Sequence, residues 1–177
     1  MNPTLYTVAY PECEAQDLMA VDTWRAAQDP AGHARIRPHF TLAFACNAVE
    51  ESVYLAHVAA VAARTAPIAF HCRYAMLGAD AHTPRAHAYL VPDEGHGALS
   101  LLHDALYTGL LAAQLRLDLP YTPHITVGTF DTAVQARQWC IERNRAGVSL
   151  LGRVAALWVG QVVEERFVHR GQFALTG

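Results

Sequence analysis

Two short stretches of the chain repeat one run of residue types: proline, histidine, an apolar residue, threonine and another apolar residue. They are PHFTL at 38–42 and PHITV at 123–127, and their histidines are 85 positions apart (124 − 39) in a chain of 177 residues. In an extended strand, side chains two positions apart share a face, so each copy places its histidine and threonine together, opposite its apolar residues. One such strand is commonplace, but two at half-chain spacing indicate that both contribute to one site. The residues expected to do chemistry are therefore His39, Thr41, His124 and Thr126.

Two histidines that face one phosphorus atom can act as a general base and a general acid. An imidazole with a pKa near 6.5 gives or takes a proton at neutral pH, and each such group contributes a factor of roughly 10² to 10⁴ in rate. Threonine hydroxyls can donate to the non-bridging oxygens and stabilise the charge that develops there. Because the second imidazole protonates the leaving oxygen, the pattern predicts a displacement that needs no metal ion and no cofactor.

The elements that must position these residues also follow a repeated order. Each motif strand is preceded by a helix and followed by a helix and two strands, which indicates an approximate internal duplication of α+β units within one domain, residues 1–177. A pseudo-twofold arrangement of the two halves would bring both His-Thr faces to one cleft. The residue patterns predict strands at 4–10, 39–46, 68–77, 85–92, 124–130, 154–163 and 166–175, helices at 12–28, 48–64, 97–117 and 131–146, and a loop at 29–38.

The charge of the chain limits the kind of partner. The net charge is −3, and the 13 basic residues are all arginine. Proteins that hold long RNA through many phosphates are usually basic, so we expect a small nucleotide or a short RNA end as the partner. The lack of lysine argues against an ATP-dependent ligase that forms a covalent lysine–nucleotide intermediate.

The composition also suggests a location. With 53% hydrophobic and 16% charged residues the chain is globular. Its four scattered cysteines fit free thiols in a reducing compartment. No stretch approaches the roughly 20 apolar residues of a membrane span, and the first residues lack a signal-peptide pattern. We expect a cytoplasmic protein without a membrane or obligate protein partner, and no metal site, because the remaining histidines lack carboxylate or thiolate companions at ligand spacing.

Four further residues are candidates for substrate binding. Arg35 and Arg37 precede the first motif and could meet a phosphate, although solvated loop arginines are the commoner case. Tyr121 precedes the second motif and could stack on a base, although ordinary packing is commoner. Arg73 lies on the polar face of strand 68–77 and could bind phosphate if that face lines the cleft. The substrate-binding residues that we expect are Arg37, Arg73 and Tyr121.

The motifs HFTL (39–42) and HITV (124–127) resemble those of the two-histidine (2H) phosphoesterase superfamily, which includes the 2′–5′ RNA ligase-like proteins. The resemblance spans nearly the whole chain. It implies a bilobal α+β fold with two antiparallel sheets, flanked by helices, around a central cleft. It also implies cleavage of a cyclic phosphodiester or a 2′–5′ bond without a metal, with reverse ligation in some members. On the matching positions, His39 and His124 would be the acid–base pair, in either order, and Thr41 and Thr126 would hold the phosphate.

Three functions remain open from the sequence. The first is a phosphodiesterase, a hydrolase of RNA processing, that acts on a 2′,3′- or 1″,2″-cyclic nucleotide or on short 2′–5′-linked RNA. The second is a nucleotide- or RNA-binding module of the same fold without catalysis. In the third, the motifs serve only strand pairing. The intact pair of histidines and threonines favours the first.

Overall fold

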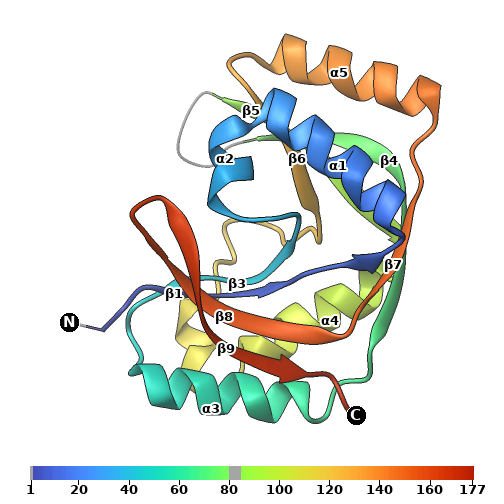
Figure 1. Cartoon of the computed structure of the whole chain (residues 1–177). Helices are drawn as coiled ribbons and strands as arrows, with labels where there is room; N and C mark the ends of the chain where they lie inside the picture. Colours follow the sequence, from blue (N-terminus) through green and yellow to red (C-terminus); the bar gives the residue numbers. More distant parts are fainter. Residues whose placement is uncertain (1, 80–84) are drawn as a thin grey trace.

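The computed structural model describes residues 2–79 and 85–177, and it contains two antiparallel β-sheets with helices packed around them (Figure 1). The first sheet has the strand order β3-β1-β8-β9 and the second has the order β2-β7-β4-β5-β6. This architecture confirms the expected α+β fold. The strands are β1 Leu5–Ala9, β2 Glu12–Cys13, β3 Phe40–Cys46, β4 Ile68–Ala79, β5 Ala86–Glu94, β6 Ile125–Phe130, β7 Leu150–Val154, β8 Ala156–Val163 and β9 Arg166–Ala174. The helices are α1 Ala15–Gln28, α2 Pro30–Arg35, α3 Glu51–Ala62, α4 His96–Leu106, the 3₁₀ helix η1 Gly109–Gln114 and α5 Ala133–Ala146.

Each motif strand lies at an edge of its sheet. Within the described ranges, β3 pairs only with β1, and β6 pairs only with β5. The chain after β3 forms α3 and the hairpin β4–β5, and the chain after β6 forms α5, β7 and the hairpin β8–β9. Each hairpin joins the sheet that contains the other motif strand. The order of elements repeats only approximately, because β7 is an extra strand in the second half, and the two halves of the chain are interleaved between the sheets.

The apolar side of the first motif strand forms part of a core shared by both sheets. Phe40 and Leu42 are fully buried, and the ring of Phe40 packs edge-to-face on Phe70 of β4 with the centroids 5.1 Å apart. On the same side of the first sheet, the hydroxyl of Tyr54 in α3 bonds to Thr7 Oγ1 of β1 at 2.9 Å. This pair satisfies two buried polar groups that would otherwise be costly. The core thus fixes the strand that follows His39.

Helix α5 covers β4, β5 and β6 of the second sheet (Figure 1). It begins with a capping box, in which Thr132 and Gln135 each accept a hydrogen bond from the other's backbone N–H. Near its end, Asn144 accepts from the N–H of Ala75 at 2.7 Å and donates to the carbonyl of Ala75 at 2.9 Å. These bonds attach α5 to β4 at Ala75, next to the point where the register between β4 and β5 shifts. They fix the strand pair against which the second motif strand lies.

The prediction of a loop over 29–38 is wrong for Pro30–Arg35, which form α2. The side chain of Asp29 accepts from the N–H of Gly32 at 3.2 Å, and Pro30 occupies the first turn of the helix. An aspartate cap followed by proline favours a helix start, because the cap satisfies a free N–H and proline has none to satisfy. Proline and glycine in one short stretch suggested a loop instead.

The prediction of one helix over 97–117 is wrong beyond Leu106. Helix α4 ends there, and the chain continues as the separate helix η1. Gly109 opens η1 with φ at +54°, a left-handed conformation that glycine adopts without steric strain. The turn redirects the chain toward the second motif.

Two predictions at the borders of strands also need correction. The predicted strand 154–163 is divided at Ala155, where the chain passes from β7 in the second sheet to β8 in the first. The predicted helix 12–28 starts only at Ala15, because residues 12–13 form β2 and pair with β7.

Candidate active site

The two motif histidines make the same local hydrogen bond. His39 Nδ1 lies 2.9 Å from the carbonyl oxygen of Arg37, and His124 Nδ1 lies 2.7 Å from the carbonyl oxygen of Thr122. A carbonyl oxygen only accepts, so both Nδ1 atoms carry a proton and both Nε2 atoms keep the lone pair of the neutral ring. In each motif the accepting residue precedes a proline, whose fixed φ constrains the turn that brings carbonyl and ring together. The proline of each motif therefore helps to set the tautomer of the histidine after it.

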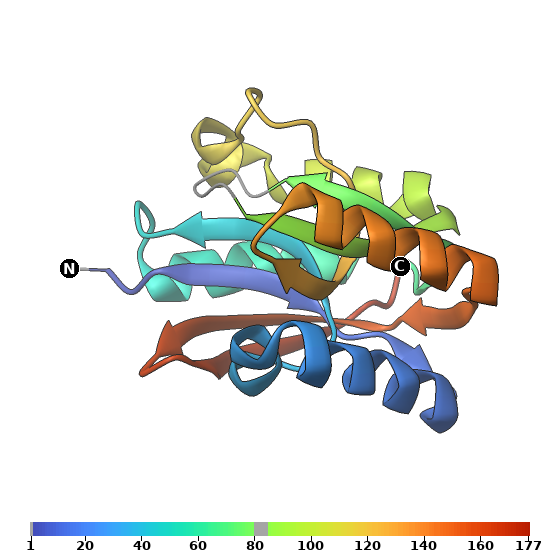
Figure 2. The same cartoon turned by 90° about the horizontal axis from the view of Figure 1, so that it is seen from above.

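The two motifs also approach each other in space. Figures 1 and 2 show the start of β3 beside the start of β6, and each motif histidine immediately precedes one of these strands. The hydroxyl of Tyr121, in the segment that leads into β6, donates to the carbonyl of Thr41 in β3 at 3.0 Å. The charge of His124 is one of the smaller causes that lower the pKa of His39. The structure thus brings together residues 85 positions apart.

Both motif histidines have lowered pKa values. Desolvation is the largest cause for His39 and lowers its pKa to about 4, the charges of Arg25 and His124 act in the same direction, and the bond to the Arg37 carbonyl opposes them. Desolvation is also the largest cause for His124, where the charge of His87 adds to it and the bond to Thr122 opposes it. Both residues are partly buried, and the structure shows no protein partner for either Nε2 among the described residues. In the free protein both imidazoles are neutral at pH 7.

The ring of His124 stacks on Tyr89 of β5, with the centroids 3.8 Å apart and the planes 27° apart. Tyr89 is the register partner of Thr126, so the two side chains lie on the same face of the second sheet. His87 stacks on the same tyrosine at 5.7 Å, and its Nδ1 bonds to Thr129 Oγ1 at 3.1 Å. The alternation of His87 and Tyr89 in strand 85–92 is the sequence signal that could have indicated a polar face of the second sheet at this site. Nothing in the sequence indicated that Tyr89 stacks on His124.

Gly78 leaves room for the ring of Tyr89. A Cβ atom at this position would lie 2.0 Å from Tyr89 Cε2, which is far inside contact distance. A glycine in a strand interior often marks such a close approach. The position of Tyr89, and with it the stack on His124, therefore depends on a missing side chain in the neighbouring strand.

Arg25 is a buried cation on the other side of the site. Its side chain in α1 is 2% exposed, and its Nη2 donates to the carbonyls of Gly32 at 3.0 Å and Ile36 at 2.7 Å. Within the described ranges, its Nε and Nη1 have no hydrogen-bond partner. These bonds tie α1 to the segment that leads into His39. Sequence reasoning missed Arg25, because an arginine on a helix is usually solvated.

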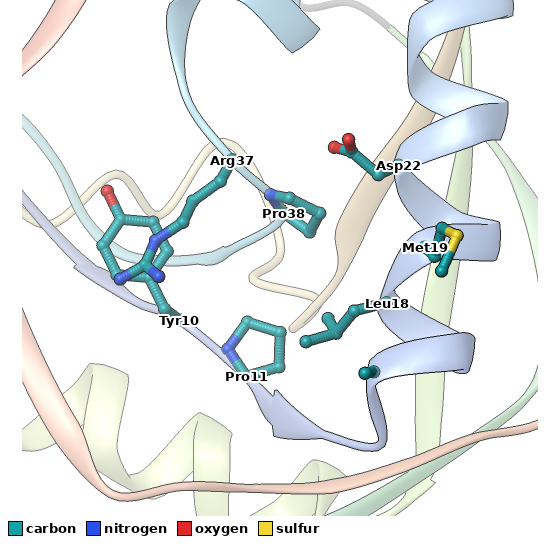
Figure 3. A pocket seen from close by; sticks show the side chains of 8 residues that line it. Tyr10, Pro11, Leu18, Met19, Asp22, Arg37 and Pro38 are labelled. Carbon is teal, nitrogen blue, oxygen red and sulfur yellow. The ribbon is translucent and has the colours of Figure 1, made fainter.

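Arg37 lies beside the first motif, as expected, but against aromatic rings. Its guanidinium is 3.7 Å from the ring centroid of Tyr10 and 5.7 Å from that of Trp158. The hydroxyl of Tyr10 is hydrogen-bonded to His169 Nε2 at 2.9 Å. Arg37 also lines a pocket of about 410 Å³, which is bounded on its other side by Leu18, Met19 and Asp22 from α1 (Figure 3).

The other substrate-binding candidates already have partners. Arg73 forms ion pairs with Asp93 and Glu94, so its charge is met within the protein. Tyr121 stacks on His103 with the centroids 3.7 Å apart, which occupies one face of its ring. Burial raises the pKa of Tyr121, so its hydroxyl stays protonated and donates to Thr41. We therefore keep Arg37 in the proposed site, and regard Tyr121 as a link between the motifs.

Neither a metal-binding cluster nor a membrane-spanning helix is found in the described structure. Among residues 2–79 and 85–177, no three histidine, cysteine, aspartate or glutamate side chains are grouped so that they could hold a metal ion. In the same part of the chain, no helix has the length and apolar character to cross a membrane.

Comparisons with solved structures show the same fold over the whole chain. The structure of E. coli LigT complexed with NADP⁺ matches with a TM-score of 0.57 at 19% identity, and all of both chains is covered. TT0787 of Thermus thermophilus matches with a TM-score of 0.57 at 16% identity over 98% of each chain. Kluyveromyces marxianus Usb1 matches with a TM-score of 0.54 at 11% identity, over 95% of this chain and 97% of its own. At these identities the likeness establishes the fold alone.

A comparison with curated proteins gave no match. The family model of the 2′-5′ RNA ligase superfamily, however, matches residues 11–162 and so includes both motifs. Together with the fold, this match supports a phosphodiesterase or RNA-processing role in the broad sense. The chain belongs to the 2′-5′ RNA ligase superfamily.

Proposed function

We propose that this protein is a phosphoric diester hydrolase that cleaves a cyclic nucleotide phosphate, 2′,3′ or 1″,2″, or a 2′–5′ bond in short RNA. The observation that carries the proposal is the matched pair of imidazoles. Both have Nδ1 bonded to a carbonyl two residues back, both keep Nε2 for a ligand, and they interact through their charges. No other pair of histidines in the described structure shares this arrangement at the starts of two strands, one in each sheet.

The proposed reaction uses one neutral and one protonated imidazole. The Nε2 lone pair of one histidine takes a proton from water as the water oxygen attacks phosphorus. The Nε2–H of the other gives its proton to the ester oxygen as the phosphorus–oxygen bond breaks, so one proton enters and one leaves the pair. The hydroxyls of Thr41 and Thr126 donate to the non-bridging oxygens, where negative charge grows. In 2′–5′ ligation a 5′-hydroxyl takes the place of water in the attack on the cyclic phosphate, and the two histidines exchange roles in the reverse cleavage of the 2′–5′ bond.

A bound phosphate would raise the lowered pKa values of His39 and His124. A negative charge between the two rings favours their protonated forms, so substrate binding raises both pKa values and lets one ring carry a proton near neutral pH. Three of the LigT structures are complexes with NADP⁺, 3′-AMP and ATP, which supports a nucleotide as the substrate class. The net charge of −3 agrees with a small nucleotide or a short RNA end.

The test is a turnover assay with a substrate panel. The panel contains 2′,3′-cyclic mononucleotides, ADP-ribose 1″,2″-cyclic phosphate and 2′–5′ oligoadenylate, each with and without EDTA. We expect turnover of at least one substrate, unchanged by EDTA. Tight binding in calorimetry without any turnover would instead support the non-catalytic binding module, and loss of turnover with EDTA would refute the metal-free reaction.

A further inference from the structure

Arg37 lies against aromatic rings just before the first motif. Its guanidinium lies 3.7 Å from the centroid of Tyr10, and Trp158 lies beside both, with the centroids of Tyr10 and Trp158 5.6 Å apart. His169 fixes the hydroxyl of Tyr10. Stacking of this kind orients a planar guanidinium at a modest cost in side-chain entropy, and the side chain of Arg37 remains exposed.

Within residues 2–79 and 85–177, the charge of Arg37 is not paired with a carboxylate. Among the described residues, no acidic side chain forms an ion pair with it, whereas Arg35, two positions earlier, is paired with Glu165. Asp22 is the only acidic residue that lines the pocket next to Arg37, and its carboxylate accepts a hydrogen bond from His33 Nε2 at 3.1 Å. The pocket in Figure 3 therefore presents an oriented, exposed cation that has no anionic partner in the described part of the protein.

Arg37 packs against the same face of the first sheet that carries Thr41 of the first motif. Val8 is the register partner of both Thr41 and Trp158, so these side chains share a face of the first sheet, and Tyr10 follows Val8 by two positions. Arg37 stacks on this face two residues before His39, and the turn between them bonds the ring of His39 to the carbonyl of Arg37 at 2.9 Å. Arg37 is therefore a cation next to the first motif, in a position to meet a second anionic group of a substrate whose phosphate is bound at His39.

We propose that Arg37 binds a second phosphate of the substrate, the one on the 5′ side of the nucleoside whose cyclic phosphate or 2′–5′ bond reacts. A guanidinium fork matches two phosphate oxygens with two parallel hydrogen bonds. The preferred substrate is then the end of a short RNA, or a nucleotide with a 5′-phosphate, and not a nucleoside that carries the cyclic phosphate alone. This inference rests on the proposed function of the histidine pair.

Three substrates distinguish the effect of a 5′-phosphate from the effect of an additional nucleotide. They are a nucleoside 2′,3′-cyclic phosphate with a free 5′-hydroxyl, the same compound with a 5′-phosphate, and a dinucleotide that ends in the 2′,3′-cyclic phosphate. We expect kcat/KM to be about tenfold or more higher for the last two, since a hydrogen bond to a charged group is typically worth that much. The preference should fall as salt rises.

Variants of the two neighbouring arginines provide the control. In Arg37→Gln the preference for the 5′-phosphate should fall to near one, and Arg37→Lys should keep part of it. Arg35→Gln should leave the preference as in the wild type, because Arg35 is already paired with Glu165. Equal kcat/KM for the compounds with and without a 5′-phosphate, or an undiminished preference in folded Arg37→Gln, would overturn the inference.

A binding assay separates this inference from the proposed function. Calorimetry on His124→Ala compares a nucleoside 3′,5′-bisphosphate with the nucleoside 3′-monophosphate, and needs no turnover. Tighter binding of the bisphosphate that disappears in His124→Ala/Arg37→Gln supports the subsite even if no cyclic phosphate is cleaved. Turnover without any 5′-phosphate preference leaves the histidine pair intact and removes only the role of Arg37.

Discussion

The two halves of the candidate site hold their histidines in the same way and surround them differently. In both, a carbonyl two residues back holds Nδ1. Around His124 the neighbours are aromatic, namely Tyr89 and behind it His87. On the side of His39 they are cationic, with Arg25 buried in α1 and Arg37 stacked at the entrance. The motif therefore determines the tautomer, and the rest of the chain determines the environment of each ring.

This difference gives the two sides separate tasks. Positive charges near His39 disfavour its protonation and attract the anionic substrate. The stacked tyrosine at His124 adds little charge and restricts the ring plane instead. A duplicated fold can thus supply two copies of one local geometry while the surrounding residues distinguish them.

The largest effect is expected from removing either imidazole. His39→Ala and His124→Ala should each lower kcat by roughly 10² to 10⁴, because each removes a general acid or base. Circular dichroism should show both variants folded, since both rings are half-buried and lie outside the shared core. His71→Ala is the control, as His71 bonds to Ser149 away from the motifs. Wild-type kcat in either motif variant would contradict the shared site.

Arg25→Gln should have the next largest effect, and it tests the cationic side. The carbonyls of Gly32 and Ile36 lose their donor, so thermal unfolding should show a loss of roughly 1–3 kcal/mol. Removal of the positive charge favours protonated His39, so its pKa should rise. The histidine NMR titration of the folded variant measures this directly. An unchanged pKa of His39 would show that Arg25 has only a structural role.

A smaller effect is expected from Tyr89→Leu, which tests the aromatic side. Loss of the stack should lower kcat by about two- to tenfold, the equivalent of an aromatic pair, with less change in KM. Tyr89→Phe keeps the ring and should retain most of the activity. Gly78→Ala should resemble Tyr89→Leu, because its Cβ displaces the tyrosine ring. If Tyr89→Leu has the wild-type kcat and an unshifted His124 NMR signal, the stack does not position the ring.

The smallest effect is expected from a change of pH, measured as the pH dependence of kcat/KM of the wild-type protein. The base must be neutral and the acid protonated, so kcat/KM of the free enzyme rises through the lower pKa and falls through the higher. Both histidines have a pKa below the ordinary value of 6.5, and that of His39 is about 4. The profile should therefore be bell-shaped with its maximum below pH 6.5. A maximum above pH 7 would mean that other groups carry the reaction.

The sequence was sufficient for those features that depend on local pattern. The alternation in HFTL and HITV predicted which side chains face the site, and Phe40 and Leu42 are indeed buried opposite Thr41. The order of strands and helices predicted the fold class, because each element has its own period. The hairpin of strands 68–77 and 85–92 is present as β4 and β5.

Features that depend on tertiary contact were not predictable. At Ala155 the chain changes sheets without a turn residue, since only the pairing partners of β7 and β8 distinguish them. The burial of Arg25 depends on carbonyls of Gly32 and Ile36, in and just after α2, a helix that the sequence pattern did not indicate. The stack of Tyr89 on His124 joins two strands through a gap left by Gly78 in a third. No single stretch of sequence contains such an arrangement.

The most direct test of the shared site is a crystal structure with inorganic phosphate or a nucleoside 3′-phosphate bound. The account predicts one phosphoryl group whose oxygens lie about 3 Å, hydrogen-bond distance, from Nε2 of both His39 and His124. It also predicts that both Nδ1 atoms keep their bonds to the carbonyls of Arg37 and Thr122. A phosphate held by only one of the two rings, with the other turned away, would contradict it.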